Sequence, residues 1–241
     1  MKWIILTGDT GMLGSSIASR ILEEKDYGVI GISRSENQIT NDFKNRYDNR
    51  YFHIDYDLSN SREIKSLFKK EIQGVGKIYG LVNNSAYAYD DIITNAKIEN
   101  VEKMLTINVT SPMVLTKYVI RNMLLNDTEG SIVHISSICA HTGYKGLSMY
   151  AATKGAIESF SRTIAREWGK RGIRSNCIAP GFMESSMSSS LSEEQKERIY
   201  KRNSLKKETD AISVASTVKF LLSKESRSIT GQVIHVDNGT I

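Results

Sequence analysis

Short apolar runs alternate with longer amphipathic stretches along the chain, and this alternation predicts strands and helices in turn. The runs Ile-Ile-Leu at 4–6 and Ile-Gly-Ile at 30–32 are typical of parallel strands buried on both faces. Strands are predicted at 3–6, 29–32, 51–54, 78–82, 131–135, 173–178 and 232–236. Helices are predicted near 12–25, 60–72, 98–125, 149–170, 194–203 and 210–222, with a weaker one near 40–46.

This order favours an α/β protein, with a doubly wound parallel sheet of about seven strands covered by helices on both faces. The chain has 241 residues, which suits one domain over 1–241, and no Pro/Gly/Ser-rich linker divides it. The unusual stretch is 182–209, where a run of serines precedes a segment dense in charge. Because it follows a strand end, we expect a mobile substrate lid there, with a surface loop as the alternative.

Composition narrows the class of protein. The net charge is +5, but Lys and Arg are spread along the chain without interleaved aromatics, so we expect no nucleic-acid partner. The two cysteines, Cys139 and Cys177, match no metal spacing, which predicts free thiols in a reducing compartment and no bound metal. The apolar run at 3–6 is too short for a signal peptide, and no run of about 18 apolar residues occurs. We therefore expect a cytoplasmic protein without a membrane partner.

A glycine-rich turn, Thr-Gly-Asp-Thr-Gly-Met-Leu-Gly at 7–14, follows the first predicted strand and opens the first helix. Glycines allow a tight turn and close approach of a pyrophosphate, while the helix N-terminus offers free N–H donors and a partial positive charge. The turn therefore predicts a dinucleotide cradle. Its expected contact residues are Thr7, Gly8, Thr10, Gly11, Met12, Leu13 and Gly14.

The end of the second predicted strand bears on the choice of cofactor. An acidic residue there would bind the 2′-hydroxyl of NAD, but no carboxylate precedes Glu36. Ser33 and Arg34 occupy the position instead, and a guanidinium suits a 2′-phosphate. The sequence therefore favours NADP(H) over NAD(H), unless Arg34 is simply a solvated loop residue.

Tyr150 and Lys154 are four residues apart on a predicted helix, so both project from one face of it. An ammonium beside a phenol is expected to lower the phenol pKa. Such a tyrosine could exchange a proton with a substrate oxygen near neutral pH. Ser137 lies thirteen residues upstream, after a predicted strand.

From Lys2 to Gly239 these motifs, in this order, resemble the classical short-chain dehydrogenase/reductase family, whose fold is of the Rossmann type. The motifs are the glycine turn, Asp57-Leu58-Ser59, Asn83-Asn84-Ser85-Ala86, Asn108, Ser137, Tyr150, Lys154 and Asn176-x-x-x-Pro180-Gly181. The resemblance implies that Tyr150 protonates a substrate carbonyl oxygen and that Ser137 binds that oxygen. It implies that Lys154 lowers the Tyr150 pKa and holds the nicotinamide ribose, and that Asn108 binds a water linking Lys154 to solvent. It also implies cofactor contacts from Asp57, Leu58, Asn84, Ser85, Ala86, Tyr150, Lys154, Pro180, Gly181, Met183 and Ser185.

The glycine turn departs from the family pattern Thr-Gly-x-x-x-Gly-x-Gly. Met12 replaces the middle glycine, and the resulting spacing is similar to that of the extended branch of the family. Gly11 occupies a position where many NADPH-dependent members carry a basic residue. The cofactor prediction therefore rests mainly on Arg34.

Within the family, the segments 179–187, 191–195 and 229–236 resemble those of 3-oxoacyl-acyl-carrier-protein reductases. This implies NADPH-dependent, reversible reduction of a ketone to a secondary alcohol, on a substrate held by a carrier protein. Arg171 matches a basic residue that those enzymes direct toward the carrier, but the stretch at 126–129 is acidic and would repel it. Basic residues of the expected lid could compensate. They are Lys196, Arg198, Lys201, Arg202, Lys206 and Lys207.

Two alternatives remain at this point. The first is a related enzyme acting on a sugar, a nucleotide-sugar or another small ketone. The second is a catalytically silent NADP-binding regulator, which the presence of Ser137, Tyr150 and Lys154 argues against. Members of the family form dimers or tetramers. The resemblance therefore implies one interface on the helices near 98–125 and 149–170, and another on the final strand.

Overall fold

The computed structural model describes residues 1–184 and 192–241. Its strands form one parallel sheet in the order β3-β2-β1-β4-β5-β6-β7, which confirms the predicted fold class. The chain reverses direction across the sheet between β1 and β4, the position at which such sheets bind ligands. The strands are β1 (Lys2–Thr7), β2 (Tyr27–Ser33), β3 (Tyr51–Asp55), β4 (Ile78–Asn83), β5 (Gly130–Ile135), β6 (Ile173–Pro180) and β7 (Val233–Val236).

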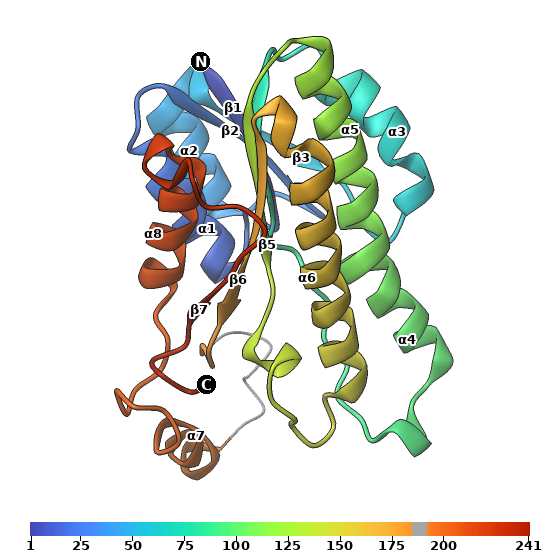
Figure 1. Cartoon of the computed structure of the whole chain (residues 1–241), viewed down its shortest axis with the longest axis vertical. Coiled ribbons are helices and arrows are strands. Elements are labelled where there is room, and N and C mark those ends of the chain that lie inside the picture. The colour runs from blue at the N-terminus through green and yellow to red at the C-terminus, as the bar shows by residue number, and fades with distance from the viewer. Residues whose placement is uncertain (185–191) are drawn as a thin grey trace.

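Helices cover both faces of this sheet (Figure 1). One layer holds α1 (Met12–Leu22), α2 (Gln38–Tyr47) and α8 (Ala211–Leu222). The opposite layer holds α3 (Ile64–Leu67), α4 (Ile98–Leu105), α5 (Ser111–Leu125) and α6 (Ser148–Trp168). The helix α7 (Glu193–Tyr200) lies apart from both layers, beyond the carboxyl ends of the strands.

Two apolar clusters, one on each face of the sheet, form the core. Ile4 and Leu6 of β1 belong to the cluster under α1 and α8, whereas Ile5 belongs to the cluster under α3, α5 and α6. All three side chains are fully buried, as the continuous apolar run predicts. Gly28 in β2 leaves room for the ring of Trp3, because a Cβ there would lie 2.4 Å from a ring carbon.

The helix predicted over 98–125 is interrupted in the structure. A π-helical turn (Thr106–Thr110) joins α4 to α5, and a second one (Phe68–Ile72) follows α3. A π turn inserts one residue into the helical ladder, which often happens at functional sites. Asn108 lies inside the first of these turns and is buried.

Part of the predicted lid at 182–209 is described. Ser192 and Gln195 form a reciprocal capping box that begins α7. Glu184 accepts a hydrogen bond from Tyr200 at 2.7 Å and forms an ion pair with Lys196 at 3.1 Å. These contacts hold α7 against the segment after β6. Residues 185–191 of the predicted lid lie outside the described residues. A single domain with a substrate lid stays a prediction.

Candidate functional site

The glycine turn between β1 and α1 has the geometry of an anion cradle. Gly8 adopts a positive φ of 75°, which favours glycine. Gly14 packs against the turn so closely that a Cβ would lie 1.9 Å from the carbonyl oxygen of Gly8. Gly11 is the N-cap of α1, and no side chain in the described part of the chain caps the helix, so its first N–H groups remain available to a ligand. Met12, where the turn departs from the expected pattern, is exposed at the first helical position.

The ends of β1 and β4 are locked together beside this turn. The hydroxyl oxygen of Thr7 accepts hydrogen bonds from the backbone N–H groups of Asn84 and Ser85, both at 2.9 Å. The side-chain amide of Asn84 donates to the carbonyl oxygens of Thr7 (2.9 Å) and Gly8 (3.3 Å). These bonds fix the start of the loop that contains Ala86. The sequence predicted these residues as neighbours of the cofactor, and the structure brings them to one edge of the sheet.

The end of β2 lies on the other side of the glycine turn. Thr10 donates from Oγ1 to the hydroxyl of Ser33 at 3.1 Å, and Asn37 donates from its amide to the carbonyl oxygen of Thr10 at 3.0 Å. Asn37 also begins α2 through a capping box with Thr40, so this helix is anchored to the turn. Arg34 is exposed next to Ser33 and has no ion pair within residues 1–184 and 192–241. The sequence did not indicate the role of Asn37, although an Asn three residues before a Thr at a helix start is a recognisable cap signal.

Asp57 and Leu58 follow β3 at the same edge. The Asp57 carboxylate accepts a bond from the Ser59 N–H at 2.8 Å, and this backbone bond is the main reason that its pKa is lowered. Leu58 is buried, and its carbonyl oxygen accepts from the Ser111 hydroxyl of α5. Hydrogen bonds therefore hold both residues of this segment in place, and their predicted contact with the cofactor stays a prediction.

Ser137, Tyr150 and Lys154 meet at the carboxyl end of β5. Ser137 follows β5 as the N-cap of a short 3₁₀ helix (Ile138–Ala140), and its Oγ accepts from the Cys139 N–H at 3.2 Å. Tyr150 and Lys154 project from the first turns of α6, with Lys154 Nζ 5.4 Å from the centroid of the Tyr150 ring. Lys154 is buried and donates to the carbonyl oxygen of Ile135 at 2.8 Å.

The electrostatics of this pair differ from the prediction. Burial raises the pKa of the Tyr150 phenol above its ordinary value, and Cys139 and Asp90 make smaller contributions in the same direction. Burial lowers the pKa of Lys154 to about 8. The expected lowering of the phenol pKa by Lys154 does not appear in this structure, where desolvation of the phenol sets the direction of the shift. A phenol with a raised pKa holds its proton at neutral pH.

Asn108 connects the loop after β4 to α6. Its amide donates to the carbonyl oxygen of Tyr87 at 2.9 Å and to the Thr153 hydroxyl at 3.1 Å, while its Oδ1 accepts from the Tyr87 N–H at 2.8 Å. Thr153 in turn donates to the carbonyl oxygen of Tyr150 at 2.7 Å. The side chain of Asn108 is thus a bridge one residue away from Lys154. The sequence did not identify Thr153, because a threonine between the two site residues carries no signal of its own.

A second network that the sequence did not reveal fixes the segment around Ser137. Glu158 lies one helical turn beyond Lys154 and is buried. Its carboxylate accepts from the hydroxyl of Ser136 and lies 3.0 Å from Nε2 of His141. Both ends of the Ser137 segment are therefore fastened to α6. Glu158 also raises the pKa of Lys154, against the larger effect of burial.

Pro180 and Gly181 complete the site at the end of β6. Gly181 donates from its N–H to the carbonyl oxygen of Val236 at 2.9 Å, and a Cβ on Gly181 would lie 2.5 Å from the Thr209 hydroxyl. Met183 is half-buried and packs against the core cluster under α1 and α8. Ser185, predicted as a further cofactor contact, lies outside the described residues.

Within residues 1–184 and 192–241, no group of three or more His, Cys, Asp or Glu side chains is arranged to hold a metal ion. No helix in the described part of the chain combines the length and the apolar character that crossing a membrane requires.

Comparisons with known proteins support the family predicted from the sequence. The protein family described as "Enoyl-(Acyl carrier protein) reductase" matches residues 11–240. A 3-oxoacyl-(acyl-carrier-protein) reductase from Buchnera aphidicola is 31% identical over 240 residues, which cover 99% of this chain and 96% of that protein. The structure of 4-hydroxyisoleucine dehydrogenase complexed with NADH has a TM-score of 0.92 at 24% identity, covering 100% of this chain and 98% of that one. The structure of ElxO with NADP bound has a TM-score of 0.89 at 25% identity, covering 99% and 98%.

Proposed function

The chain belongs to the short-chain dehydrogenase/reductase family, and on that premise we propose that it reduces a ketone to a secondary alcohol with NADPH. The observation that carries the proposal is the position of Tyr150 and Lys154 on one face of α6, at the strand edge that also holds Ser137 and the glycine turn. A proton donor and a dinucleotide cradle at one edge are what hydride transfer to a carbonyl needs.

The cradle fits a nicotinamide dinucleotide in this chain's own geometry. Gly8 and Gly14 have no room for a Cβ, so the backbone can pack closely at the N-terminus of α1, where a pyrophosphate would lie. Ser33 and Arg34 would bind the adenosine ribose, with the unpaired guanidinium on a 2′-phosphate. Pro180, Gly181 and Asn84 would border the nicotinamide, and the remaining predicted contacts would line the path between the two ends. When bound, the nicotinamide supplies the hydride.

The protein's part in the reaction is to position the substrate and to supply a proton. Tyr150 is a neutral phenol, so it has a proton to donate to the carbonyl oxygen as negative charge develops there. The hydroxyl of Ser137 is held by the Cys139 N–H and is free to donate to the same oxygen. Lys154 contributes positive charge beneath the ring while protonated. Asn108 holds the loop after β4 against α6, and the widened π turn around it would admit the relay water.

The substrate class that we favour is a 3-oxoacyl thioester, and one surface feature bears on whether a carrier protein presents it. Arg171 pairs with Asp127 at 3.2 Å, and both side chains are largely exposed. An acidic carrier would have to compete with Asp127 for this guanidinium. Lys196 and Lys201 of the predicted lid are likewise paired with glutamates. These contacts favour, as the second candidate, a small ketone or sugar substrate that is free of a carrier.

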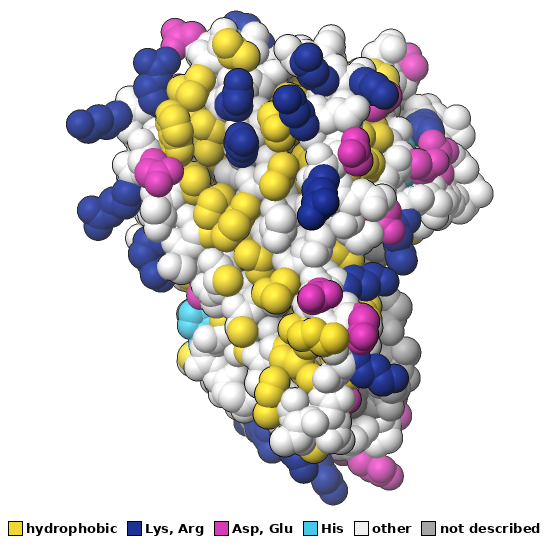
Figure 2. Space-filling model, turned by 90° about the vertical axis from the view of Figure 1, so that its right-hand side faces the viewer, with side chains coloured by type: hydrophobic (Ala, Val, Ile, Leu, Met, Phe, Trp, Pro, Cys, Tyr) yellow, Lys and Arg dark blue, Asp and Glu magenta, His cyan; other side chains and the backbone are white. Residues whose placement is uncertain are grey.

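We further propose a homo-oligomer. Figure 2 shows an apolar band over the face formed by the α3–α6 layer. Ile98 and Leu105 of α4 are 62% and 46% exposed on helices that the sequence analysis assigned to an interface. A second copy covering this face would bury them. A cytoplasmic location accompanies the proposal, because both cysteines are free thiols.

The test is NADPH oxidation by the purified chain with acetoacetyl-CoA, acetoacetyl-carrier protein and a panel of ketosugars. Turnover of the thioesters supports the main proposal, and a higher kcat/KM for the carrier-bound form would add the carrier as a partner. Turnover of ketosugars alone selects the second candidate. NADPH binding without turnover of any ketone would instead support a silent regulator and overturn the proposed activity.

A further inference from the structure

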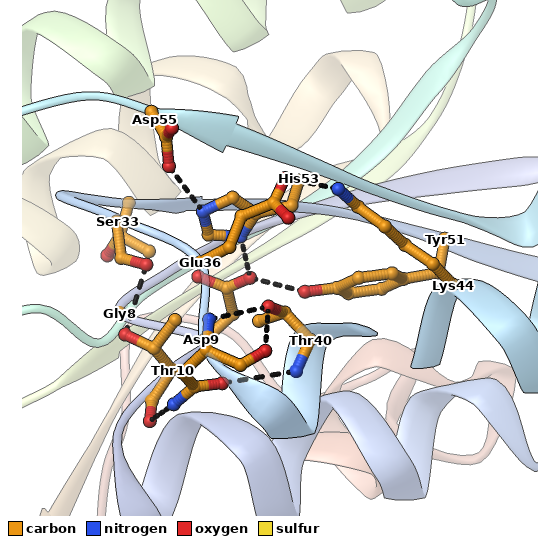
Figure 3. A network of polar contacts seen from close by, with 12 residues as sticks. Gly8, Asp9, Thr10, Ser33, Glu36, Thr40, Lys44, Tyr51, His53 and Asp55 are labelled. Carbon is orange, nitrogen blue, oxygen red and sulfur yellow. Dashed lines mark hydrogen bonds and ion pairs between the residues drawn. The ribbon is translucent and has the colours of Figure 1, made fainter. Parts of the chain in front are cut away.

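His53 on β3 is held between two carboxylates (Figure 3). Its Nδ1 lies 2.7 Å from Oδ2 of Asp9 and its Nε2 lies 3.2 Å from Oδ1 of Asp55. Ionised carboxylates only accept hydrogen bonds, so satisfying both contacts requires a proton on each ring nitrogen. In this geometry His53 is an imidazolium.

The Asp9 contact is the more firmly fixed of the two. The side chains of Asp9 and His53 are both 0% exposed, and Tyr51 donates its hydroxyl to the same Oδ2 at 2.6 Å. Gly31 in β2 makes room for this carboxylate, because a Cβ there would lie 1.9 Å from Asp9 Oδ2. The other carboxylate oxygen, Oδ1, is buried and has no hydrogen-bond partner among the residues that the structure describes. A buried carboxylate is costly unless a cation accompanies it, so His53 keeps its Nδ1 proton toward Asp9.

The Asp55 contact is the one that can be released. The Asp55 side chain is 63% exposed, and its contact with His53 is longer. Asp55 is the register partner of Ser33 in the β2–β3 ladder, and His53 is the partner of Gly31. Ser33 and the adjoining Thr10 stand where the adenosine ribose would bind, so the charge of Asp55 lies beside the position at which the 2′-substituent is read.

Glu36 and Arg34 are further charged residues, just after β2. Glu36, in the loop before α2, pairs with Lys44 of that helix, and Arg34 follows Ser33. Burial lowers the His53 pKa, but the hydrogen bond to Asp9 and the charges of Asp9, Asp55 and Glu36 raise it to a net value above the ordinary one. His53 therefore keeps its proton to a higher pH than an ordinary histidine and loses it as the pH rises through this raised value.

We propose that His53 determines the preference between NADPH and NADH through Asp55. When His53 carries both protons, it neutralises Asp55 and a 2′-phosphate can bind beside Ser33. When His53 loses the proton on Nε2, Asp55 becomes a free carboxylate that repels a 2′-phosphate and accepts a hydrogen bond from a 2′-hydroxyl. This inference rests on the proposed function, because it requires the dinucleotide to bind at the glycine turn.

The test is to measure Kd for NADPH and for NADH by fluorescence titration from pH 6 to pH 9. The variants are His53→Gln and Asp55→Asn, with His235→Gln, an exposed histidine of β7, as the matched control. A phosphate monoester itself titrates near pH ~6, so wild type and variants are compared at each pH. Between pH 6 and pH 9, the ratio of the NADH Kd to the NADPH Kd should fall by roughly threefold to tenfold in wild type and control, beyond any change that the variants also show. This is the size expected for one unit charge near a partly exposed site.

The two variants should differ from each other in a defined way. Asp55→Asn should keep the high, NADPH-favouring ratio at alkaline pH, whereas His53→Gln should show the low ratio already at pH 6. If both variants follow the wild-type course, the inference is overturned. Should His53→Gln fail to fold, the exposed Asp55→Asn variant decides alone. Failure of wild type to bind either dinucleotide would overturn the proposed function itself, which is a different outcome.

Discussion

The Nζ atom of Lys154 lies 5.4 Å from the centroid of the Tyr150 ring while donating to the carbonyl oxygen of Ile135. The end of β5 therefore fixes the position of the lysine, and the tyrosine lies over it on the same helix face. Both groups are desolvated, which raises the pKa of the phenol and lowers that of the ammonium. In this environment Tyr150 is a neutral phenol, which is the form that a proton donor requires.

Replacing Tyr150 with Phe should abolish ketone reduction while leaving the dinucleotide bound. The substitution removes the acidic proton and keeps the ring, so we expect kcat to fall by about 10²- to 10⁴-fold, the usual contribution of general acid catalysis. Assays of NADPH oxidation measure the loss of kcat. Fluorescence titration checks that the Kd for NADPH stays within about threefold of the wild-type value. Tyr118→Phe, on α5, is the matched control. A variant as active as wild type would contradict the proposed mechanism.

The alkaline limb of the pH profile should report Lys154. Its pKa is lowered to about 8, so the ammonium is present below that pH and lost above it. We expect kcat/KM for ketone reduction to decline above about pH 8, because the positive charge beneath Tyr150 disappears. In Lys154→Arg the guanidinium stays charged beyond pH ~12, so any residual activity should lack this limb. An identical limb in both proteins would assign the titration to another group.

Arg34→Ala should weaken binding of NADPH and leave binding of NADH unchanged. A hydrogen bond to a charged group contributes about 1.5–3 kcal/mol, which corresponds to a Kd increase of roughly tenfold or more. Isothermal titration calorimetry with both cofactors measures the difference. Arg227→Ala, an exposed arginine after α8, serves as the control. Equal losses for both cofactors would show that Arg34 does not read the 2′-phosphate.

Gly14→Ala should damage the cradle, because the added Cβ would lie 1.9 Å from the Gly8 carbonyl oxygen, which belongs to the backbone and cannot move aside cheaply. We expect dinucleotide affinity to fall by more than tenfold. The control is Gly169→Ala, where a Cβ meets nothing within 4 Å, and its stability should stay within about 0.5 kcal/mol of wild type. Thermal denaturation and cofactor titration on both variants make the comparison. Normal NADPH binding by Gly14→Ala would exclude the proposed close approach.

Leu105→Glu should dissociate the oligomer by placing a charge on the apolar band of α4. The side chain is already exposed in the isolated chain, so folding should persist while the interface loses its apolar contact. Light scattering after size-exclusion chromatography gives the mass of wild type and variant. Ile39→Glu, on α2 in the opposite helix layer, should leave the mass unchanged. A wild-type monomer, or an unaltered mass in Leu105→Glu, would move the interface elsewhere.

Much of the fold followed from local patterns. The runs at 4–6 and 30–32 gave buried parallel strands, and the glycines at 8, 11 and 14 gave the turn, because strand burial and tight turns depend on residues close in sequence. The break in the helix over 98–125 was missed. Its π turn is stabilised by Asn108 binding Tyr87 and Thr153, residues 21 and 45 positions away. No local periodicity carries such contacts.

The sequence by itself determined the parallel α/β architecture and the family, because both follow from the order and spacing of short motifs. It also placed Tyr150 and Lys154 on one helix face, because helical geometry is local. Only the tertiary structure decided the protonation behaviour of the site. The pKa of Tyr150 depends on desolvation by residues from other elements, and that of His53 on Asp9, which is 44 positions away in sequence. Burial and long-range charge arise only when the strands assemble, so the chemistry of both groups became visible only in the folded chain.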